Sequence, residues 1–178
     1  MKQSPYAWSR AYARQAQADL DAREALLNSG IPPCQQLHFL QMACEKICKA
    51  HRCLGGAEPE TLMHSHGYAA KVLPQIAREL LRRASFAAQL PVAQSQIVRM
   101  VQQLAREVEL LSPAVDDNGR RPDNCEYPWE DAGGILHVPA EHGFGSLDAL
   151  HRHRAGATFL KVVATAAEEL GQGAYAAS

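Results

Sequence analysis

Apolar residues recur along most of this chain three and four positions apart, which is the spacing of an amphipathic helix. Residues that favour strands are few, and strict alternation of apolar and polar positions never persists. The pattern therefore predicts an all-α protein, a four- to five-helix up-and-down bundle in which residues 1–178 form a single domain. The first four helices are expected at residues 5–27, 32–54, 61–83 and 91–111.

Proline and glycine mark the places where regular helix is expected to be disturbed. Pro74 lies inside the third predicted helix, so we expect a kink or an interruption there. A last helix is expected at residues 146–170, but its apolar positions change phase at Gly156, which predicts a bend or break near that glycine. The residues that follow, 171–178, are expected to be frayed.

A long segment at residues 112–145 shows no helical period and contains several prolines, glycines and acids. It exceeds the roughly 12 to 15 residues usual for a loop without structure of its own. Two aromatic residues, Tyr127 and Trp129, flank a proline within it. Because aromatic side chains are uncommon in disordered segments, the sequence predicts an ordered loop that is functional or packs over the bundle.

Composition narrows the class of protein and of partner. The chain has 178 residues, 47% apolar and 21% charged, which is typical of a folded globular protein. Its net charge of −1 gives no overall attraction for polyanions, so binding of RNA would need a local basic patch. No apolar run approaches the roughly 18 residues of a membrane span. We therefore expect no membrane contact and a cytoplasmic location.

Five cysteines leave two interpretations open. Cys44 and Cys48 lie four positions apart on the second predicted helix, and His51 follows, so together they form one loose group of metal ligands. Structural zinc sites usually need two paired clusters, which favours the other interpretation, buried cysteines in the reduced state. No glycine-rich phosphate loop occurs in a suitable context, so we predict no metal and no cofactor.

Three stretches together resemble a HEPN domain. They are Ala-Asp-Leu in the first predicted helix, the sequence HFLQMACEKICKAH at residues 38–51, and HSHGY at residues 64–68. The residues that carry the resemblance are Asp19, Leu20, Phe39, Gln41, Ala43, Glu45, Lys46, Lys49, Ala50, and His64 or His66. The likeness extends over about residues 8–80.

The resemblance implies a helical bundle, usually dimeric, from a family with many metal-independent ribonucleases of toxin–antitoxin, CRISPR and phage-defence systems. The catalytic motif of that family is an arginine, four to six residues and a histidine, in which the guanidinium holds the phosphate and the imidazole moves a proton. No arginine of this chain has a histidine at that spacing. The chain is therefore expected to be catalytically silent and to bind a partner protein from the same operon, or an RNA.

An alternative is a divergent ribonuclease that needs no metal. Its candidate residues would be Arg121, His151, Arg152 and His153. The run from His151 to Arg154 is the most basic short stretch of the chain, and a solvated turn is the ordinary explanation of such a run.

Candidate binding residues also lie on the second helix and at the start of the third. The polar stripe of the second helix consists of His38, Gln41, Glu45, Lys49 and Arg52. We expect a homodimer whose helices pack near this stripe. Glu45 and Lys49 form either an ordinary pair on a solvated face or a polar site in the dimer or ligand cleft. His66, like His64, either caps a helix in solvent or belongs to such a site.

Tyr127 and Trp129 either close the core from outside or build a recognition surface. We predict a mixed arrangement. In it Trp129 packs against the bundle, while Asn124, Glu126 and Tyr127 line a surface. Arg121 would be available beside them for contact with an anion.

Overall fold

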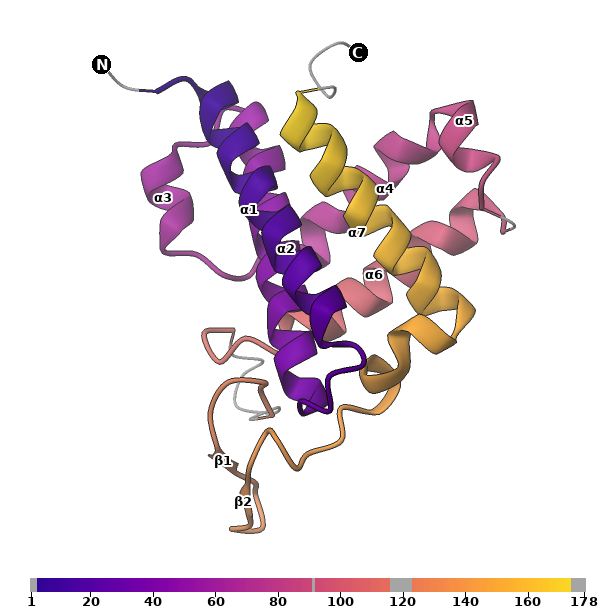
Figure 1. The fold of residues 1–178 in the computed structure, drawn as a ribbon. Helices are drawn as coiled ribbons and strands as arrows, with labels where there is room; N and C mark the ends of the chain where they lie inside the picture. The colour runs from indigo at the N-terminus through magenta and orange to yellow at the C-terminus, as the bar shows by residue number, and fades with distance from the viewer. Residues whose placement is uncertain (1–2, 91, 116–122, 174–178) are drawn as a thin grey trace.

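The computed structural model describes residues 3–90, 92–115 and 123–173, which form an all-α bundle with one very small sheet (Figure 1). The long helices are α1 (Pro5–Leu26), α2 (Pro33–Leu54), α4 (Ala69–Leu81), α6 (Gln94–Glu109) and α7 (Arg154–Gln172). The short elements are α3 (Pro59–Met63), α5 (Ala84–Ala87), the 3-10 helix η1 (Gly145–Arg152) and the strands β1 (Trp129–Glu130) and β2 (Leu136–His137). The predicted fold class is confirmed. Among the described residues, none of the helices combines the length and the apolarity that a membrane span requires.

Helices α1 and α2 form an antiparallel pair joined by a short turn, and α7 packs beside α1 (Figure 1). The hydroxyl oxygen of Ser4 caps α1, because it accepts a hydrogen bond from the backbone N–H of Ala7 at 3.2 Å. Helix α2 begins at Pro33, where a missing N–H costs no helical hydrogen bond. Its predicted apolar stripe is confirmed, since all five residues are buried: Leu37, Leu40, Cys44, Ile47 and Cys48.

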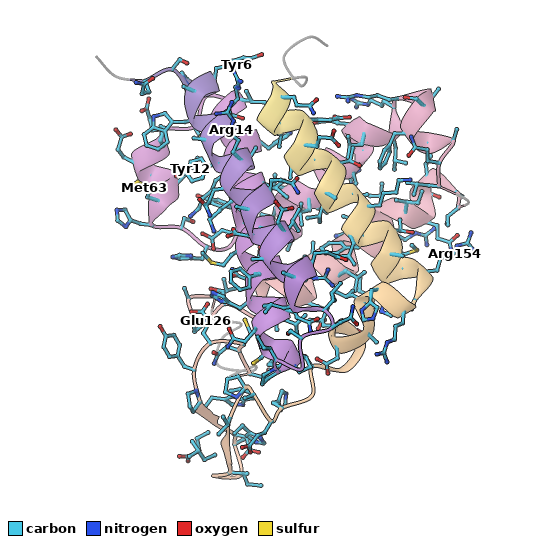
Figure 2. The ribbon with its side chains drawn as sticks, in the orientation of Figure 1. Tyr6, Tyr12, Arg14, Met63, Glu126 and Arg154 are labelled. Atoms are coloured by element: carbon cyan, nitrogen blue, oxygen red, sulfur yellow. The ribbon has the colours of Figure 1, made fainter. Side chains whose placement is uncertain are left out.

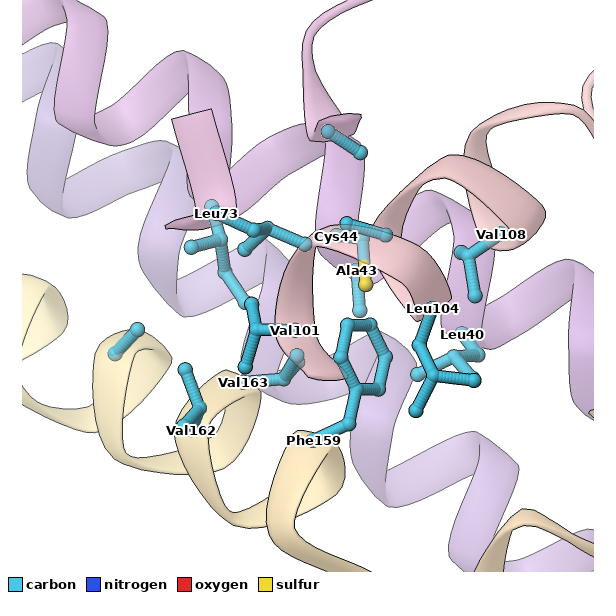
Figure 3. Packing of buried hydrophobic residues seen from close by; sticks show 14 of the residues in the cluster. Leu40, Ala43, Cys44, Leu73, Val101, Leu104, Val108, Phe159, Val162 and Val163 are labelled. Carbon is cyan, nitrogen blue, oxygen red and sulfur yellow. The ribbon is translucent and has the colours of Figure 1, made fainter. Parts of the chain in front are cut away.

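Phe159 of α7 lies at the centre of the core with no exposed surface (Figure 3). Figure 3 shows its ring directed toward Ala43 and Cys44 of α2, with Leu104 of α6 nearby. Truncation of a buried aromatic side chain of this size to alanine costs about 3 to 5 kcal/mol of stability. The core thus ties α2, α6 and α7 together and fixes α2, on which several candidate residues lie.

The third predicted helix, at residues 61–83, is wrong in its extent. Helix α3 ends at Met63, and α4 begins at Ala69 after a turn. Pro74 lies within α4, where it removes one helical hydrogen bond without interrupting the helix. The turn between α3 and α4 holds the HSHGY sequence, so the histidines of this stretch stand on a connection and not on a continuous helix.

The break predicted near Gly156 falls at His153, between η1 and α7. His153 has extended backbone angles (φ −121°, ψ 150°) and so separates the two helices. Gly156 serves this arrangement differently, because a Cβ at this position would lie 2.0 Å from the carbonyl oxygen of Leu150. The phase change in the sequence therefore reflects close packing of α7 on η1. Helix α7 extends to Gln172, so fraying predicted from residue 171 starts too early, and residues 174–178 lie outside the described chain.

The predicted loop before the last helix is ordered where the structure describes it, and it contains a hairpin. Strands β1 and β2 are antiparallel, with Trp129 opposite His137. Asp131 shapes the turn, because its Oδ1 accepts backbone hydrogen bonds from Gly133 at 2.8 Å and Ile135 at 3.0 Å. We call residues 123–144 the hairpin segment. Figure 1 shows it projecting from the end of the bundle at which α2 begins.

All five cysteines are free and buried, so the predicted burial of these side chains is confirmed. His51 turns toward Glu79, with 3.0 Å between its Nε2 and Oε2 of the carboxylate. The described residues contain no group of three or more His, Cys, Asp or Glu side chains placed to hold a metal ion.

Candidate functional site

Three polar side chains of α2 are buried. Only 3% of the surface of Gln41, 6% of that of Glu45 and 5% of that of Lys49 is exposed to solvent. Within this group Lys49 Nζ donates to Glu45 Oε1 at 2.6 Å, and Gln41 Nε2 donates to Glu45 Oε2 at 3.2 Å. The connection between α3 and α4 supplies a third donor, because His66 Nδ1 lies 3.0 Å from Oε2 of the same carboxylate. We call these four residues the Glu45 cluster.

The charge state of the Glu45 cluster follows from its hydrogen bonds. Burial alone would raise the pKa of Glu45, but the hydrogen bonds from Lys49 and His66 and their charges outweigh it and leave this pKa below its ordinary value. Glu45 is therefore an ionised carboxylate held by three donors. A buried carboxylate with this many partners acts as a structural anchor for the groups around it.

The solvated-face interpretation of Glu45 and Lys49 is wrong. Their four-residue spacing does produce an ion pair, but both side chains are buried and His66 of the α3–α4 connection contacts Glu45. Gln41, Glu45 and Lys49 are enclosed by their own chain, whereas His38 and Arg52 at the two ends of the stripe keep exposed surface, so the predicted dimer contact near the stripe stays a prediction. His66 itself is not a simple solvent-exposed cap, because it bonds to Glu45 while its side chain remains 39% exposed.

Two further charged residues of the HEPN-like stretches, Asp19 and Lys46, also pair within the chain. Lys46 Nζ lies 2.6 Å from Oδ2 of Asp19, and this bridge joins α2 to α1 in a partly buried position. His64 is exposed at the end of α3. The residues that suggested the resemblance thus hold the first two helices and the α3–α4 connection together.

The candidate ribonuclease residues do not converge on one site. His153 caps α7: its Nδ1 accepts the backbone N–H of Gly156 at 2.9 Å, and its Nε2 lies 3.1 Å from the carbonyl oxygen of Ser146. Both ring nitrogens are therefore engaged with backbone. His151 and Arg152 are exposed neighbours, with the Arg152 Nε donating to His151 Nε2 at 3.3 Å. Arg121 lies outside the described residues.

The hairpin segment separates its two aromatic residues as predicted. Trp129 is 8% exposed, whereas Tyr127 is 61% exposed and Glu126 is also exposed. Asn124 corrects the prediction, because it is buried and does not line a surface. Its Oδ1 accepts the backbone N–H groups of Glu126 at 2.9 Å and Tyr127 at 2.7 Å, so it bends the chain that presents the tyrosine.

A cluster of rings supports the hairpin segment from behind. Trp129 stacks on His137 at 5.4 Å between ring centres and meets His142 edge-on at 4.8 Å. Phe144 closes the cluster at 4.9 Å from His142. His137 Nε2 also lies 2.9 Å from Asp131 Oδ2. These contacts hold the short hairpin in one position.

The segment is also fixed to the bundle. The backbone N–H of Cys125 donates to the carbonyl oxygen of Leu111 at 3.1 Å, next to the end of α6. Glu126 lies 3.7 Å from Nδ1 of His38 on α2. Figure 2 shows Glu126 where the hairpin segment meets the bundle.

Sequence reasoning missed the apolar tip of the hairpin. Ile135 is 61%, Leu136 69% and Val138 39% exposed, and Tyr127 belongs to the same segment. We call these four residues the apolar tip. The signal was present as an apolar run after two glycines, but a run of that length is equally typical of a buried strand.

Comparison of the chain with protein-family models, with curated proteins and with solved structures finds no match. The resemblance to HEPN domains therefore stays a prediction that rests on the residues given above.

Proposed function

We propose that this chain is a HEPN-like, catalytically silent protein of a prokaryotic defence or toxin–antitoxin system that binds a partner protein through the apolar tip. The observation that carries the proposal is the exposure of four large apolar side chains on one braced segment. The described part of the chain exposes seven large hydrophobic residues, and four of them fall between residues 127 and 138. Exposure of so many large apolar side chains on one short segment of a small protein favours an interaction site.

Rigidity of the segment supports a binding role. An exposed loop that orders on binding loses affinity, because its conformational entropy has to be given up. Here the Trp129 ring cluster and the Asn124 and Asp131 turns already fix the backbone. The apolar tip is thus presented in one arrangement before any partner arrives.

Catalytic silence is supported by the way the candidate residues are used. His153 is a helix cap, and His66 is bonded to a carboxylate that also binds Lys49. A ribonuclease without a metal needs a phosphate-binding cation beside a free imidazole. His151 and Arg152 have these residue types, but adjacent exposed side chains lack a fixed geometry for phosphate.

Binding is tested by capture of proteins encoded next to this gene. Purified wild-type chain, an Ile135→Asp/Leu136→Asp variant and a Met63→Asp variant are each offered the same recombinant neighbours. Met63 is a matched control, because it is 50% exposed and lies on α3. We expect wild type and control to retain one neighbour and the hairpin variant to lose it. Retention by the hairpin variant would refute the proposal.

Catalysis is tested separately. Wild type and His151→Ala and Arg152→Ala variants are incubated with mixed RNA in EDTA, and the products are separated on a denaturing gel. We expect intact RNA in every lane. Cleavage by wild type that both variants lose would establish the ribonuclease alternative.

Homodimer formation belongs to the same proposal, through helices that pack near the polar stripe of α2 but not through its three buried residues. Light scattering over a dilution series is the measurement. A mass corresponding to two chains at micromolar concentration is expected, and monomer throughout would remove the dimer from the proposal.

A further inference from the structure

We infer that the apolar tip recognises a basic amphipathic protein segment, one in which lysine or arginine side chains flank apolar ones. The inference rests on the proposed function, that the tip binds a partner protein. It goes further by assigning the charge of that partner, and it is carried by the acidic residues that surround the tip.

The hairpin segment differs in charge from the rest of the chain. Its acids are Asp123, Glu126, Glu130, Asp131 and Glu141, and it has none of the 18 lysines and arginines of the sequence. The remaining 14 of the 19 acids are outnumbered by those 18 basic residues. Negative charge is thus concentrated on the segment that holds four of the seven exposed large hydrophobic residues of the described chain.

The acids stand directly beside the apolar tip. Glu130 is opposite Leu136 in the register of the hairpin, and Glu126 precedes Tyr127 in the chain. Within the described residues, neither Glu126 nor Glu130 pairs with a lysine or an arginine. The charge of Glu130 is therefore available to a partner, and that of Glu126 lies 3.7 Å from His38.

Asp131 contributes a charge that is fixed in position. The hydrogen bond from His137, together with those from the backbone N–H groups of Ile135 and Gly133, holds the pKa of Asp131 below its ordinary value. Its carboxylate is consequently ionised at the base of the turn that carries Ile135 and Leu136. An incoming cation therefore meets the carboxylates of Glu130, opposite Leu136, and of Asp131, at the turn.

This charge pattern selects among partner classes. Nucleic acid binding needs cations along the phosphate backbone, and exposed aromatic rings such as Tyr127 bind bases only when such cations accompany them. An acidic protein surface would be repelled by the carboxylates around the tip. A segment with apolar side chains for the tip and basic residues for the surrounding carboxylates satisfies both features, and the charges also accelerate its association.

The test is selection from a phage-displayed library of random 16-residue peptides on the immobilised full chain. Binders are retained if they bind wild type and fail to bind Ile135→Asp/Leu136→Asp. We expect the retained peptides to be enriched in lysine, arginine and large apolar residues. Synthetic copies of them should lose affinity about tenfold when Glu126 and Glu130 are both changed to lysine, and also when salt is raised from low to high concentration.

The matched control is Glu58→Lys/Glu168→Lys, which changes the charge equally at the start of α3 and near the end of α7. It should leave peptide affinity within about twofold, since these positions lie away from the hairpin segment (Figure 1). Circular dichroism of each variant confirms that the bundle is folded.

The outcomes distinguish a failure of the predicted partner charge from a failure of partner binding itself. Peptides that depend on the tip but are neutral or acidic would overturn the partner charge and leave partner binding standing. An absence of any tip-dependent peptide would count against both. Tip-dependent retention of a poly(U) RNA in a parallel filter assay would overturn the choice of protein over nucleic acid.

Discussion

On α2 the chain buries a carboxylate and an ammonium group, whereas on the hairpin segment it leaves four large apolar side chains in water. Both arrangements cost free energy by themselves. They differ in whether other groups of the same chain offset that cost. Glu45 finds its three donors inside the chain, so its burial needs nothing further. The apolar tip has no cover within the described residues. The comparison teaches that the Glu45 cluster serves the fold and that the tip is the better candidate for function.

The largest expected effect is on the Glu45 cluster. Glu45→Leu leaves Lys49 buried without its carboxylate, and loss of one partner of a buried pair costs about 3 to 5 kcal/mol of unfolding free energy. Urea unfolding followed by circular dichroism measures this cost. Glu45→Leu/Lys49→Leu is the control and should recover most of the stability, because no charge is left unpaired. A Glu45→Leu protein as stable as wild type would show that the cluster does not anchor α2.

A second test compares the two aromatic residues of the hairpin segment. Trp129→Ala removes a buried ring and should cost about 3 kcal/mol in the same unfolding assay. Tyr127→Ala removes an exposed ring and should cost less than about 0.5 kcal/mol. Equal destabilisation by the two changes would make the whole segment a structural lid and would argue against a recognition role for Tyr127.

The pH dependence of stability sharpens the comparison further. The folded-state pKa of Glu45 is lowered, so its contribution to stability is complete above the unfolded value near 4.5 and is lost as the pH falls through the folded pKa. Glu109 has the opposite sign. Burial raises its pKa above the usual value, so the folded state loses stability as the pH rises through that raised pKa.

Chemical denaturation at a series of pH values measures both contributions. We expect Glu45→Gln to flatten the loss of stability in acid, and Glu109→Gln to remove a decrease on the neutral side. In Glu109→Gln the amide oxygen can still accept the hydrogen bond that the backbone N–H of Ala70 donates at 2.9 Å. A Glu45→Gln protein with an unchanged acid limb would contradict the assignment of that limb to the Glu45 cluster.

The smallest expected effect on stability is at the apolar tip itself. Ile135→Ser and Leu136→Ser should each change the unfolding free energy by no more than about 0.5 kcal/mol, because these side chains bury little surface in the free protein. Thermal unfolding of each variant, compared with wild type, would reveal any change larger than this limit. A clear loss of stability would mean that the tip packs within its own chain and would weaken its role in binding.

Local periodicity accounts for the parts of the fold that the sequence could predict. α1, α2 and α6 each follow one apolar stripe, and their bounds lie close to the expected ones. The burial of Glu45 was out of reach, because its cover comes from His66, 21 positions further along the chain, through a contact that no local pattern records. The helix break lies at His153 and not at the predicted Gly156. Gly156 is required for close packing against Leu150, and the residue that caps α7 lies three positions earlier.

In the candidate site, too, some features follow from the local sequence and others depend on contacts that the sequence does not reveal. Exposure of Tyr127 and burial of Trp129 could be proposed from an aromatic pair flanking a proline, but the role of Asn124 depends on two backbone N–H groups that bend back to its side chain. The exposure of Ile135 and Leu136 required the register of a two-residue ladder. A ladder so short leaves no periodicity to detect.

The buried thiols can report which part of this protein opens first, because each is modified only when its own region opens. Burial raises the pKa of Cys44 in the bundle core and of Cys125 in the hairpin segment to about 12, so neither forms appreciable thiolate in the folded protein. Alkylation therefore waits for opening, and the modified cysteine identifies the region that opened. If the hairpin segment detaches as a unit of its own, iodoacetamide will mark Cys125 while Cys44 remains unmodified, and mass spectrometry of the peptides will distinguish this from unfolding of the whole chain.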